Sequence, residues 1–264
     1  MFRVRAPALP AQSRSGGGLG GGRPGPLRLA RRRRPDRAHV LKMGGRIPRR
    51  FDDAGEYLAD ARALDASGVD SLWLADEGLE SWLLLAAIAA VTGRTRLVVP
   101  VRLADARAPE ALEDRLTTLG RLSRGRVLVA LSRDLPDGAT RRDLVARLRR
   151  HECLVMASAA DAPEACAVAE WADGVVDLDG ARERLGDAIP SMRRRHEDAG
   201  LKIPLEIWAT APMPDDRAQW RSLRAASEAA GATGLIVPAD PRLLDLLRNG
   251  DEEDDRADLG VAQG

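Results

Sequence analysis

The chain has 264 residues, of which 44% are hydrophobic and 31% charged, a composition that suits one globular domain with a substantial core. The net charge of +1 conceals an uneven distribution, because residues 1–38 carry ten arginines against the single acid Asp36. The remainder is therefore acidic, at about −8, which predicts no use for nucleic acid. No apolar run reaches the ~20 residues that a membrane span needs.

Cysteine and histidine are scarce and scattered. Cys153 and Cys166 are too few for a disulfide framework, and their spacing matches no metal motif. The histidines, His39, His151 and His196, lie far apart in the sequence. We therefore expect two reduced thiols in a cytoplasmic protein without a bound metal.

Residues 1–38 are predicted to be a disordered extension. The glycines from Gly16 to Gly22 cannot offset their ordering entropy, and the four arginines from Arg31 to Arg34 repel one another. The segment lacks the apolar stretch of a secretory signal, but its composition also fits a transit peptide. A further alternative is that translation begins at Met43 and that the start of the sequence is assigned too far upstream. An unstructured or artefactual extension is favoured over an arm that binds nucleic acid.

From residue 39 onward, short apolar runs alternate with amphipathic segments. The predicted strands are His39–Gly45, Ser71–Asp76, Arg96–Val101, Arg126–Leu131, Cys153–Ser158, Ala172–Leu178, Pro204–Thr210 and Gly234–Ala239. The clearest helices between them are Asp53–Ser67, Glu80–Val91, Pro109–Leu122 and Asp215–Ala230. Strict alternation with continuously apolar strands indicates a parallel sheet covered by helices. Eight such units predict an α/β fold of the closed (β/α)8 TIM-barrel type over residues 39–248.

Local signals support these boundaries. Asp53 and Glu56 have capping-box spacing at the start of the first helix, and Asp161 and Glu164 repeat it before the fifth. Glycines that follow helical runs, Gly68, Gly200 and Gly231, suit left-handed C-caps. Residues 249–264, with the acidic run 251–255, are predicted to be a disordered, solvated tail.

Four segments go beyond a generic barrel pattern. They are Ala66-Ser67-Gly68-Val69-Asp70-Ser71-Leu72-Trp73-Leu74-Ala75-Asp76, the helix and turn from Trp82 to Leu97, Leu122-Ser123-Arg124-Gly125-Arg126, and Ala172-Asp173-Gly174. In this order they resemble the second strand, second helix, fourth-strand approach and sixth strand of luciferase-like monooxygenases. The resemblance covers roughly residues 60–180, with a fainter match to about 245. It implies a luciferase-like TIM barrel that uses FMN or the deazaflavin coenzyme F-420 in its reduced form.

The sequence also departs from that family. Asp76 is followed by Glu77 where the family often has a histidine, and Leu131-Ser132-Arg133-Asp134 replaces a glycine-rich stretch. Only about twenty residues, 133–152, separate the fourth and fifth strands, where the family inserts a long excursion over the substrate. The chain therefore resembles a shortened and partly degenerate member, with a reduced excursion after strand 4.

Functional residues of such barrels lie on loops at the C-terminal ends of the strands. That rule nominates Gly44, Gly45, Asp76, Glu77, Arg102, Ser132, Arg133, Ser158 to Asp161, Thr210 and Asp240.

The loop from Ser158 to Asp161 is the best candidate for a cofactor phosphate. It enters a helix, where free backbone N–H groups and the helix dipole favour an anion. Ala159 and Ala160 permit close approach, Ser158 can donate a hydrogen bond, and the resemblance places a flavin phosphate at this loop. The alternative is an ordinary helix capped by Asp161, whose carboxylate would compete with the phosphate.

Arg102 and Arg133 follow neighbouring strands, and either could neutralise a phosphate or an anionic flavin ring, although most exposed arginines do neither. Pro100, near the end of the third strand, suggests a bulge or strand termination. Deazaflavin-dependent relatives have a backbone bulge there, which is a loose parallel.

Asp76 and Glu77 are the only adjacent acids at a strand end. Either could donate a proton if burial raised its pKa, although such pairs are more often solvated or cap a helix. The five tryptophans are expected in the core. No Ser/His/Asp or Cys/His arrangement, Walker loop or Rossmann fingerprint is present.

The favoured function is a flavin- or deazaflavin-dependent oxidoreductase or monooxygenase. It would act on a small organic substrate by hydride transfer or oxygen activation, with no membrane or nucleic-acid partner and with a homodimer left open. The rival is a non-catalytic, degenerate barrel that binds flavin passively or pairs with an active paralogue. The departures favour the rival, and the intact loop after the fifth strand favours the enzyme.

Overall fold

The computed structural model describes residues 41–135, 138–177 and 186–249. The predicted extension 1–38 and all but the first residue of the predicted tail 249–264 lie outside these residues.

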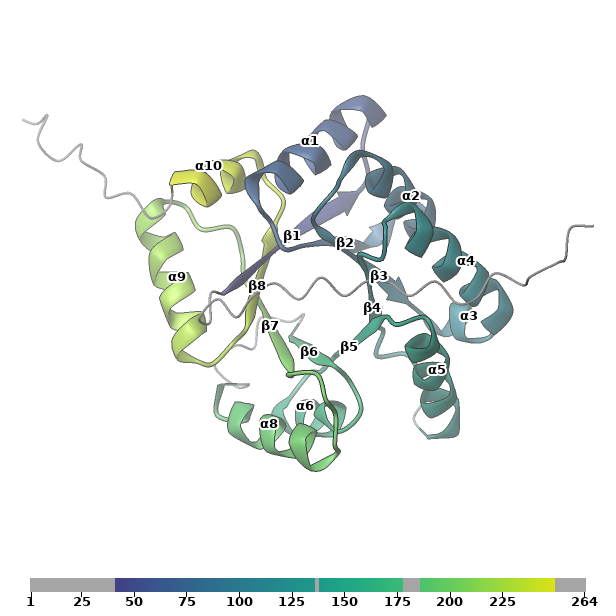
Figure 1. Ribbon diagram of the computed structural model, residues 1–264. Helices are drawn as coiled ribbons and strands as arrows, with labels where there is room; N and C mark the ends of the chain where they lie inside the picture. Colours follow the sequence, from purple (N-terminus) through teal and green to yellow (C-terminus); the bar gives the residue numbers. More distant parts are fainter. Residues whose placement is uncertain (1–40, 136–137, 178–185, 250–264) are drawn as a thin grey trace, which may run out of the picture.

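Parallel strands close into a single barrel in the order in which they follow in the sequence (Figure 1). They are β1 Lys42–Arg49, β2 Ser71–Gly78, β3 Arg96–Val101, β4 Val127–Leu131, β5 Leu154–Ser158, β6 Gly174–Asp177, β7 Glu206–Thr210 and β8 Gly234–Pro238. β8 pairs in parallel with β1 and completes the ring. The predicted (β/α)8 barrel is confirmed.

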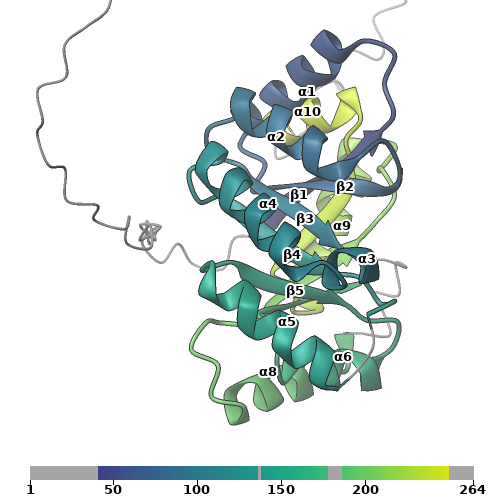
Figure 2. The same cartoon turned by 90° about the vertical axis from the view of Figure 1, so that its right-hand side faces the viewer.

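The helices surround the barrel and leave its two ends open to loops (Figures 1 and 2). They are α1 Ala54–Ser67, α2 Ser81–Val91, α3 Leu103–Ala106, α4 Pro109–Leu122, α5 Ala139–Arg150, α6 Ala162–Ala169, α8 Ile189–Asp198, α9 Arg217–Ala229 and α10 Pro241–Asn249. Among the described residues between β4 and β5, α5 is the only helix, so the connection is short, as predicted.

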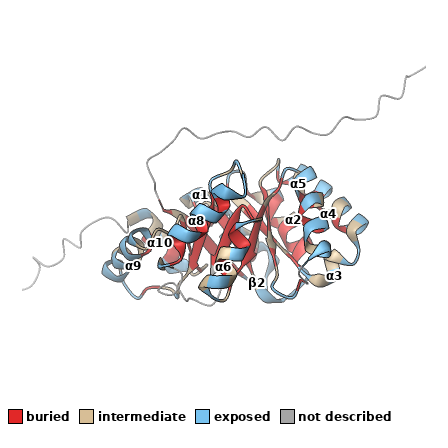
Figure 3. Ribbon diagram, turned by 90° about the horizontal axis from the view of Figure 1, so that it is seen from below, coloured by how far each residue is buried: buried red, intermediate tan, exposed pale blue. Residues whose placement is uncertain are grey.

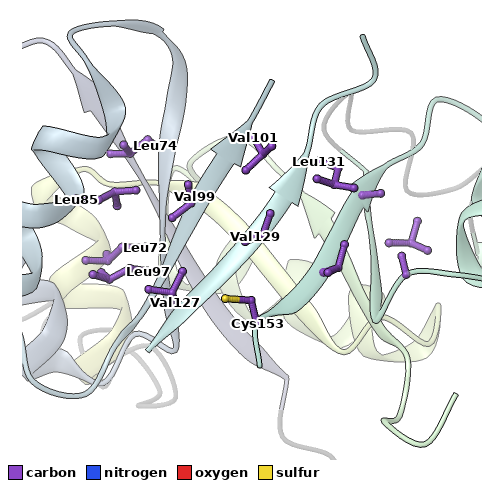
Figure 4. Packing of buried hydrophobic residues seen from close by; sticks show 14 of the residues in the cluster. Leu72, Leu74, Leu85, Leu97, Val99, Val101, Val127, Val129, Leu131 and Cys153 are labelled. Carbon is purple, nitrogen blue, oxygen red and sulfur yellow. The ribbon is translucent and has the colours of Figure 1, made fainter. Parts of the chain in front are cut away.

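The strands are buried on both faces, whereas the helices expose their outer faces (Figure 3). The larger core lies between the strands and the helices, where Leu72, Leu97 and Val129 meet side chains such as Leu85 of α2 (Figure 4). A separate core fills the barrel itself with Trp73, Val98, Leu128, Met156, Val176, Trp208 and Ile236. Two burial surfaces explain why the strands read as continuous apolar runs.

Inside the barrel, the strand register arranges side chains in layers of four from alternate strands, as is usual for this fold. The odd-numbered strands contribute three such layers. From the N-terminal end they are Lys42, Arg96, Leu154 and Glu206; then Gly44, Val98, Met156 and Trp208; and finally Arg46, Pro100, Ser158 and Thr210, which faces the C-terminal mouth.

The lowest layer closes the N-terminal end with charges. Glu206 accepts hydrogen bonds from Lys42 Nζ at 2.5 Å and from Arg96 Nη1 at 2.9 Å. Its other oxygen accepts from Trp208 Nε1 at 2.8 Å. Burial opposes ionisation, but Arg96 and Lys42 hold the pKa of Glu206 at about 2. The carboxylate is therefore ionised and fully paired.

The first strand was predicted to end at Gly45, but it continues to Arg49. Gly44 and Gly45 pair with β2 on one side and β8 on the other, so they lie inside the sheet and not at its C-terminal end. A Cβ on Gly44 would lie 2.8 Å from Trp73 Nε1, which explains the glycine as space for the indole and not as a turn. Their nomination as mouth residues is therefore wrong.

Of the two alternatives expected at Pro100, termination is observed, because β3 ends at Val101 and its pairing with β2 ends at Val98, whereas the bulge occurs elsewhere. Pro100 pairs in regular register with Ala130 of β4. The register shift lies between β1 and β2, where Ile47 pairs with Leu74 but Arg49 pairs with Gly78. Extra residues of β2 thus bulge around Asp76, at the edge of the mouth.

The predicted caps are confirmed. Asp53 accepts from Glu56 N at 2.7 Å, and Asp161 accepts from Glu164 N at 2.8 Å. Gly68, Gly200 and Gly231 all have positive φ after a helix.

Candidate functional site

The C-terminal mouth is floored by the layer of Arg46, Pro100, Ser158 and Thr210. Below it lie the buried indoles of Trp73 and Trp208, whose ring centroids are 5.6 Å apart. Small and neutral side chains make up the floor except for Arg46, which comes from β1, opposite Ser158 on β5. The inside of the barrel is solid below this level, so any ligand has to bind above it.

The loop from Ser158 to α6 already holds an anion. Ala160 N donates to Glu164 Oε2 at 2.7 Å, and Arg133 Nη2 lies 3.7 Å from the same oxygen. The Glu164 carboxylate thus sits between a backbone N–H at a helix N-terminus and a guanidinium, which is the environment that a phosphate prefers. The structure therefore brings Arg133 to the predicted loop.

The same loop has few N–H groups left for a ligand. Ala159 N donates to Val176 O at 3.1 Å, Ala160 N to Glu164, and Glu164 N to Asp161. Pro163 has no N–H. A phosphate at this loop would gain the Ala160 N–H only by displacing the Glu164 carboxylate, so Glu164 is a stronger competitor than Asp161, the competitor named from the sequence.

Asp76 and Glu77 lie on the bulge of β2, away from that loop, and both are exposed. The Glu77 carboxylate lies 3.6 Å from Arg50 Nη2. The burial on which their predicted role depended is therefore not observed at either side chain.

Arg102 belongs to this β2 corner and not to the loop after β5. Its guanidinium and that of Arg49 both donate to the main-chain oxygen of Asp76. Arg49 is buried, and its Nε has no hydrogen-bond partner. Burial and the charge of Arg102 lower the pKa of Arg49, although Asp76, Glu80 and Glu77 oppose them. Arg102 and Arg133 therefore serve two separate corners of the mouth.

Sequence reasoning missed Arg46 and Arg49. The signal was present, because Lys42, Gly44 and Arg46 alternate as one face of a strand, and Ile47 and Arg49 continue the other. The glycine pair hid this continuation.

Both described histidines lie at helix ends near the opposite face, away from the mouth. His151 is the C-cap of α5, and the His196 ring nitrogens lie 3.0 Å and 2.6 Å from the carbonyl oxygens of Ala169 and Ile203. Cys153 and Cys166 are free thiols, and burial raises the pKa of Cys153 to about 11. Within the described ranges, no His, Cys, Asp and Glu side chains cluster as a metal site. None of the helices there is long and apolar enough to cross a membrane.

The fold and mouth define a (β/α)8 barrel in which a carboxylate is held at the loop after β5, and comparison with known proteins shows which families it resembles. A family model described as luciferase-like monooxygenase matches residues 36–152. The resemblance stated from the sequence is thus confirmed over these residues. No curated protein matches its sequence.

Solved structures agree on the fold. A coenzyme F-420-dependent tetrahydromethanopterin reductase from Methanopyrus kandleri is 12% identical, covers 80% of this chain and 98% of its own, and has a TM-score of 0.58. An F-420-dependent secondary alcohol dehydrogenase, in complex with an F-420–acetone adduct, is 13% identical, with 80% and 96% coverage and a TM-score of 0.60. The monooxygenase RslO1 from Streptomyces bottropensis is 18% identical, with 72% and 78% coverage and a TM-score of 0.50.

Proposed function

We propose that this luciferase-like barrel is an oxidoreductase that binds reduced FMN or reduced coenzyme F-420 at its C-terminal mouth and acts on a small organic substrate. The observation that carries the proposal is the Glu164 carboxylate held by Ala160 N–H beside Arg133. This loop has the chemistry of an anion site, and a cofactor phosphate can replace the carboxylate there. The family match and the cofactors named for two of the similar structures support the same conclusion.

The residues of the loop fit a phosphate in stated roles. Ser158 donates a hydrogen bond from the mouth floor, Ala159 and Ala160 leave room for close approach, and Arg133 balances the charge. Arg102, on the other corner, would lie toward the ring end of the cofactor. When bound, the cofactor supplies the redox chemistry, by hydride transfer or oxygen activation, and the protein supplies position and electrostatics. Asp76 and Glu77 are the proposed proton donors.

A non-catalytic barrel is the second candidate, and the exposure of Asp76 and Glu77 favours it. Such a protein would bind the cofactor passively or pair with an active paralogue. An enzyme must bind the cofactor and turn it over, whereas a barrel that only pairs with a paralogue need not bind it and a passive binder does not turn it over.

Calorimetric titration with FMN and with coenzyme F-420 tests the cofactor site. Ser158→Asp places a charge beside the phosphate and is expected to weaken binding by about 2–4 kcal/mol, roughly thirtyfold to a thousandfold. Glu164→Gln removes the competing charge and is expected to tighten binding, as is Asp161→Asn to a smaller extent. Glu56→Gln is the matched control, because Glu56 has the same relation to its cap residue on α1.

Wild-type protein that binds neither cofactor at millimolar concentration would rule out the cofactor site. If it binds, oxygen uptake with reduced FMN separates the two candidates. An enzyme accelerates uptake over free cofactor and loses rate in Asp76→Asn or Glu77→Gln, whereas a passive barrel does neither.

A further inference from the structure

Among the described residues, the positive charges inside the barrel have a carboxylate partner at the N-terminal end but none at the C-terminal mouth. In the lowest layer, Lys42 of β1 and Arg96 of β3 share the Glu206 carboxylate of β7. The same strands supply Arg46, Pro100 and Thr210 to the mouth layer, so β7 offers a hydroxyl there in place of a carboxylate. In the described part of the chain, the Arg46 side chain has no hydrogen bond or ion pair, although it is only partly exposed.

The surroundings of Arg46 favour the binding of an anion from outside the protein. Arg46 follows Gly44 on the inward face of β1, and Gly44 leaves its own space to the Trp73 indole. A guanidinium next to an apolar floor loses hydration, so a counter-anion there is held more strongly than at an open surface. The neighbours in its layer are Ser158 and Thr210, which carry hydroxyls, and Pro100; none of them is charged.

We propose that Arg46 binds the anionic group of a small organic ligand, a carboxylate in the first instance, at the floor of the mouth. The planar guanidinium matches a carboxylate with two parallel hydrogen bonds. Arg46 belongs to β1 and the Ser158 loop follows β5, on the opposite side of the barrel, so we assign the carboxylate and the cofactor phosphate to different positions. If the proposed oxidoreductase function holds, this site assigns its substrate to the organic carboxylates. Binding of the anion itself does not depend on that function.

Benzoate and benzamide test the site, because they share a shape and differ in charge. Their binding to the full chain is followed by quenching of tryptophan fluorescence, since Trp73 and Trp208 lie directly below. Wild-type protein is expected to bind benzoate at least about tenfold more tightly than benzamide, the range of a charge-assisted hydrogen-bonded pair. Arg46→Met is expected to abolish this preference, and Arg46→Lys to keep part of it.

Arg50→Met is the matched control. Arg50 lies four residues further on, its side chain is 78% exposed, and it pairs with Glu77 outside the barrel. It is expected to keep the wild-type preference. Circular dichroism melting of each variant shows whether it is folded. Equal preference in wild type and Arg46→Met, or no preference in wild type, overturns the proposal.

FMN and riboflavin, which lacks the phosphate, separate the two sources of the anion. The preference for FMN over riboflavin is expected to survive in Arg46→Met. If it is lost while benzoate binding is unchanged, Arg46 holds the cofactor phosphate, and the substrate assignment is overturned. If wild type binds no FMN or coenzyme F-420 but binds benzoate through Arg46, the proposed function fails and this site stands.

Discussion

Glu206 shows how one residue is fixed by partners that the sequence places far away. Its carboxylate joins β7 to β1 and β3 through Lys42 and Arg96 and also accepts from Trp208. A buried carboxylate with two cations and an indole is stable only while all partners remain, because each group alone would be desolvated without compensation.

Glu206→Gln is predicted to lower the free energy of unfolding by about 3–5 kcal/mol, since Lys42 and Arg96 would then face each other without a carboxylate. Glu228→Gln, on the exposed face of α9, is the control and is expected to change little. Urea unfolding at neutral pH measures both. A loss below about 1 kcal/mol would mean that the cluster contributes little.

The same variant has a pH signature. The pKa of Glu206 is about 2 in the folded protein, below its ordinary value of about 4.3 in the unfolded chain. Its stabilisation is therefore complete above about pH 4.3 and is lost as pH falls toward 2. The decrease in the free energy of unfolding between about pH 4.3 and pH 2 should therefore be smaller in Glu206→Gln than in the wild type. In Glu228→Gln this decrease should be unchanged.

At the scale of elements, glycines of the barrel wall make room for the indoles inside it. A Cβ on Gly234 of β8 would lie 2.4 Å from Trp208 Cε3, whereas a Cβ on Gly120 of α4 meets nothing within 4 Å. Both residues are glycine, but only the first is required by packing.

Gly234→Ala is therefore predicted to destabilise the protein by about 1–3 kcal/mol, because the buried Trp208 indole must shift. Gly120→Ala is predicted to stabilise it by about 0.5–1 kcal/mol, through helix propensity alone. Thermal melts of the two variants should move in opposite directions. Equal shifts would contradict the packing argument.

Much of the family resemblance comes from residues that join elements at the N-terminal face. Asp65, at the end of α1, accepts from Gly93 N, Arg94 N and Thr95 N at 3.0, 2.9 and 2.7 Å. Burial opposes its charge, but these hydrogen bonds lower the pKa of Asp65 to about 2. Arg126 donates to the carbonyl oxygens of Ser123, Thr95, Ala89 and Thr92. These motifs are typical of the fold because their hydrogen bonds join neighbouring elements of the barrel. They lie at the N-terminal face, so they do not predict which residues bind a ligand at the C-terminal mouth.

At the scale of the whole molecule, the barrel closes with β1 and β8, and α10 packs over this closure with Leu243 and Leu246 buried. The family match begins at residue 36 and the first strand at Lys42.

Residues 1–37 are rich in glycine and arginine, so we predict that deleting them changes the melting temperature by less than about 2 °C. In a domain of this size, that shift corresponds to a change in the free energy of unfolding of under about 1 kcal/mol. Deleting α10 from Pro241 onward should lower it far more, because two buried leucines are lost. Calorimetry of the two truncations provides the comparison. A large drop for the first would assign residues 1–37 to the folded domain.

The alternation of apolar runs and amphipathic segments determined the barrel, because each unit buries its own faces against neighbours in sequence order. Caps such as Asp53 and Asp161 were predictable because their hydrogen bonds span three residues. Tertiary structure alone explains why residue 44 is a glycine, because the reason is an indole on β2. It also decided that Glu164 and Arg133 share one loop and that Arg46 lacks the carboxylate that Lys42 has. Those facts depend on the register of strands distant in sequence, which no local pattern encodes.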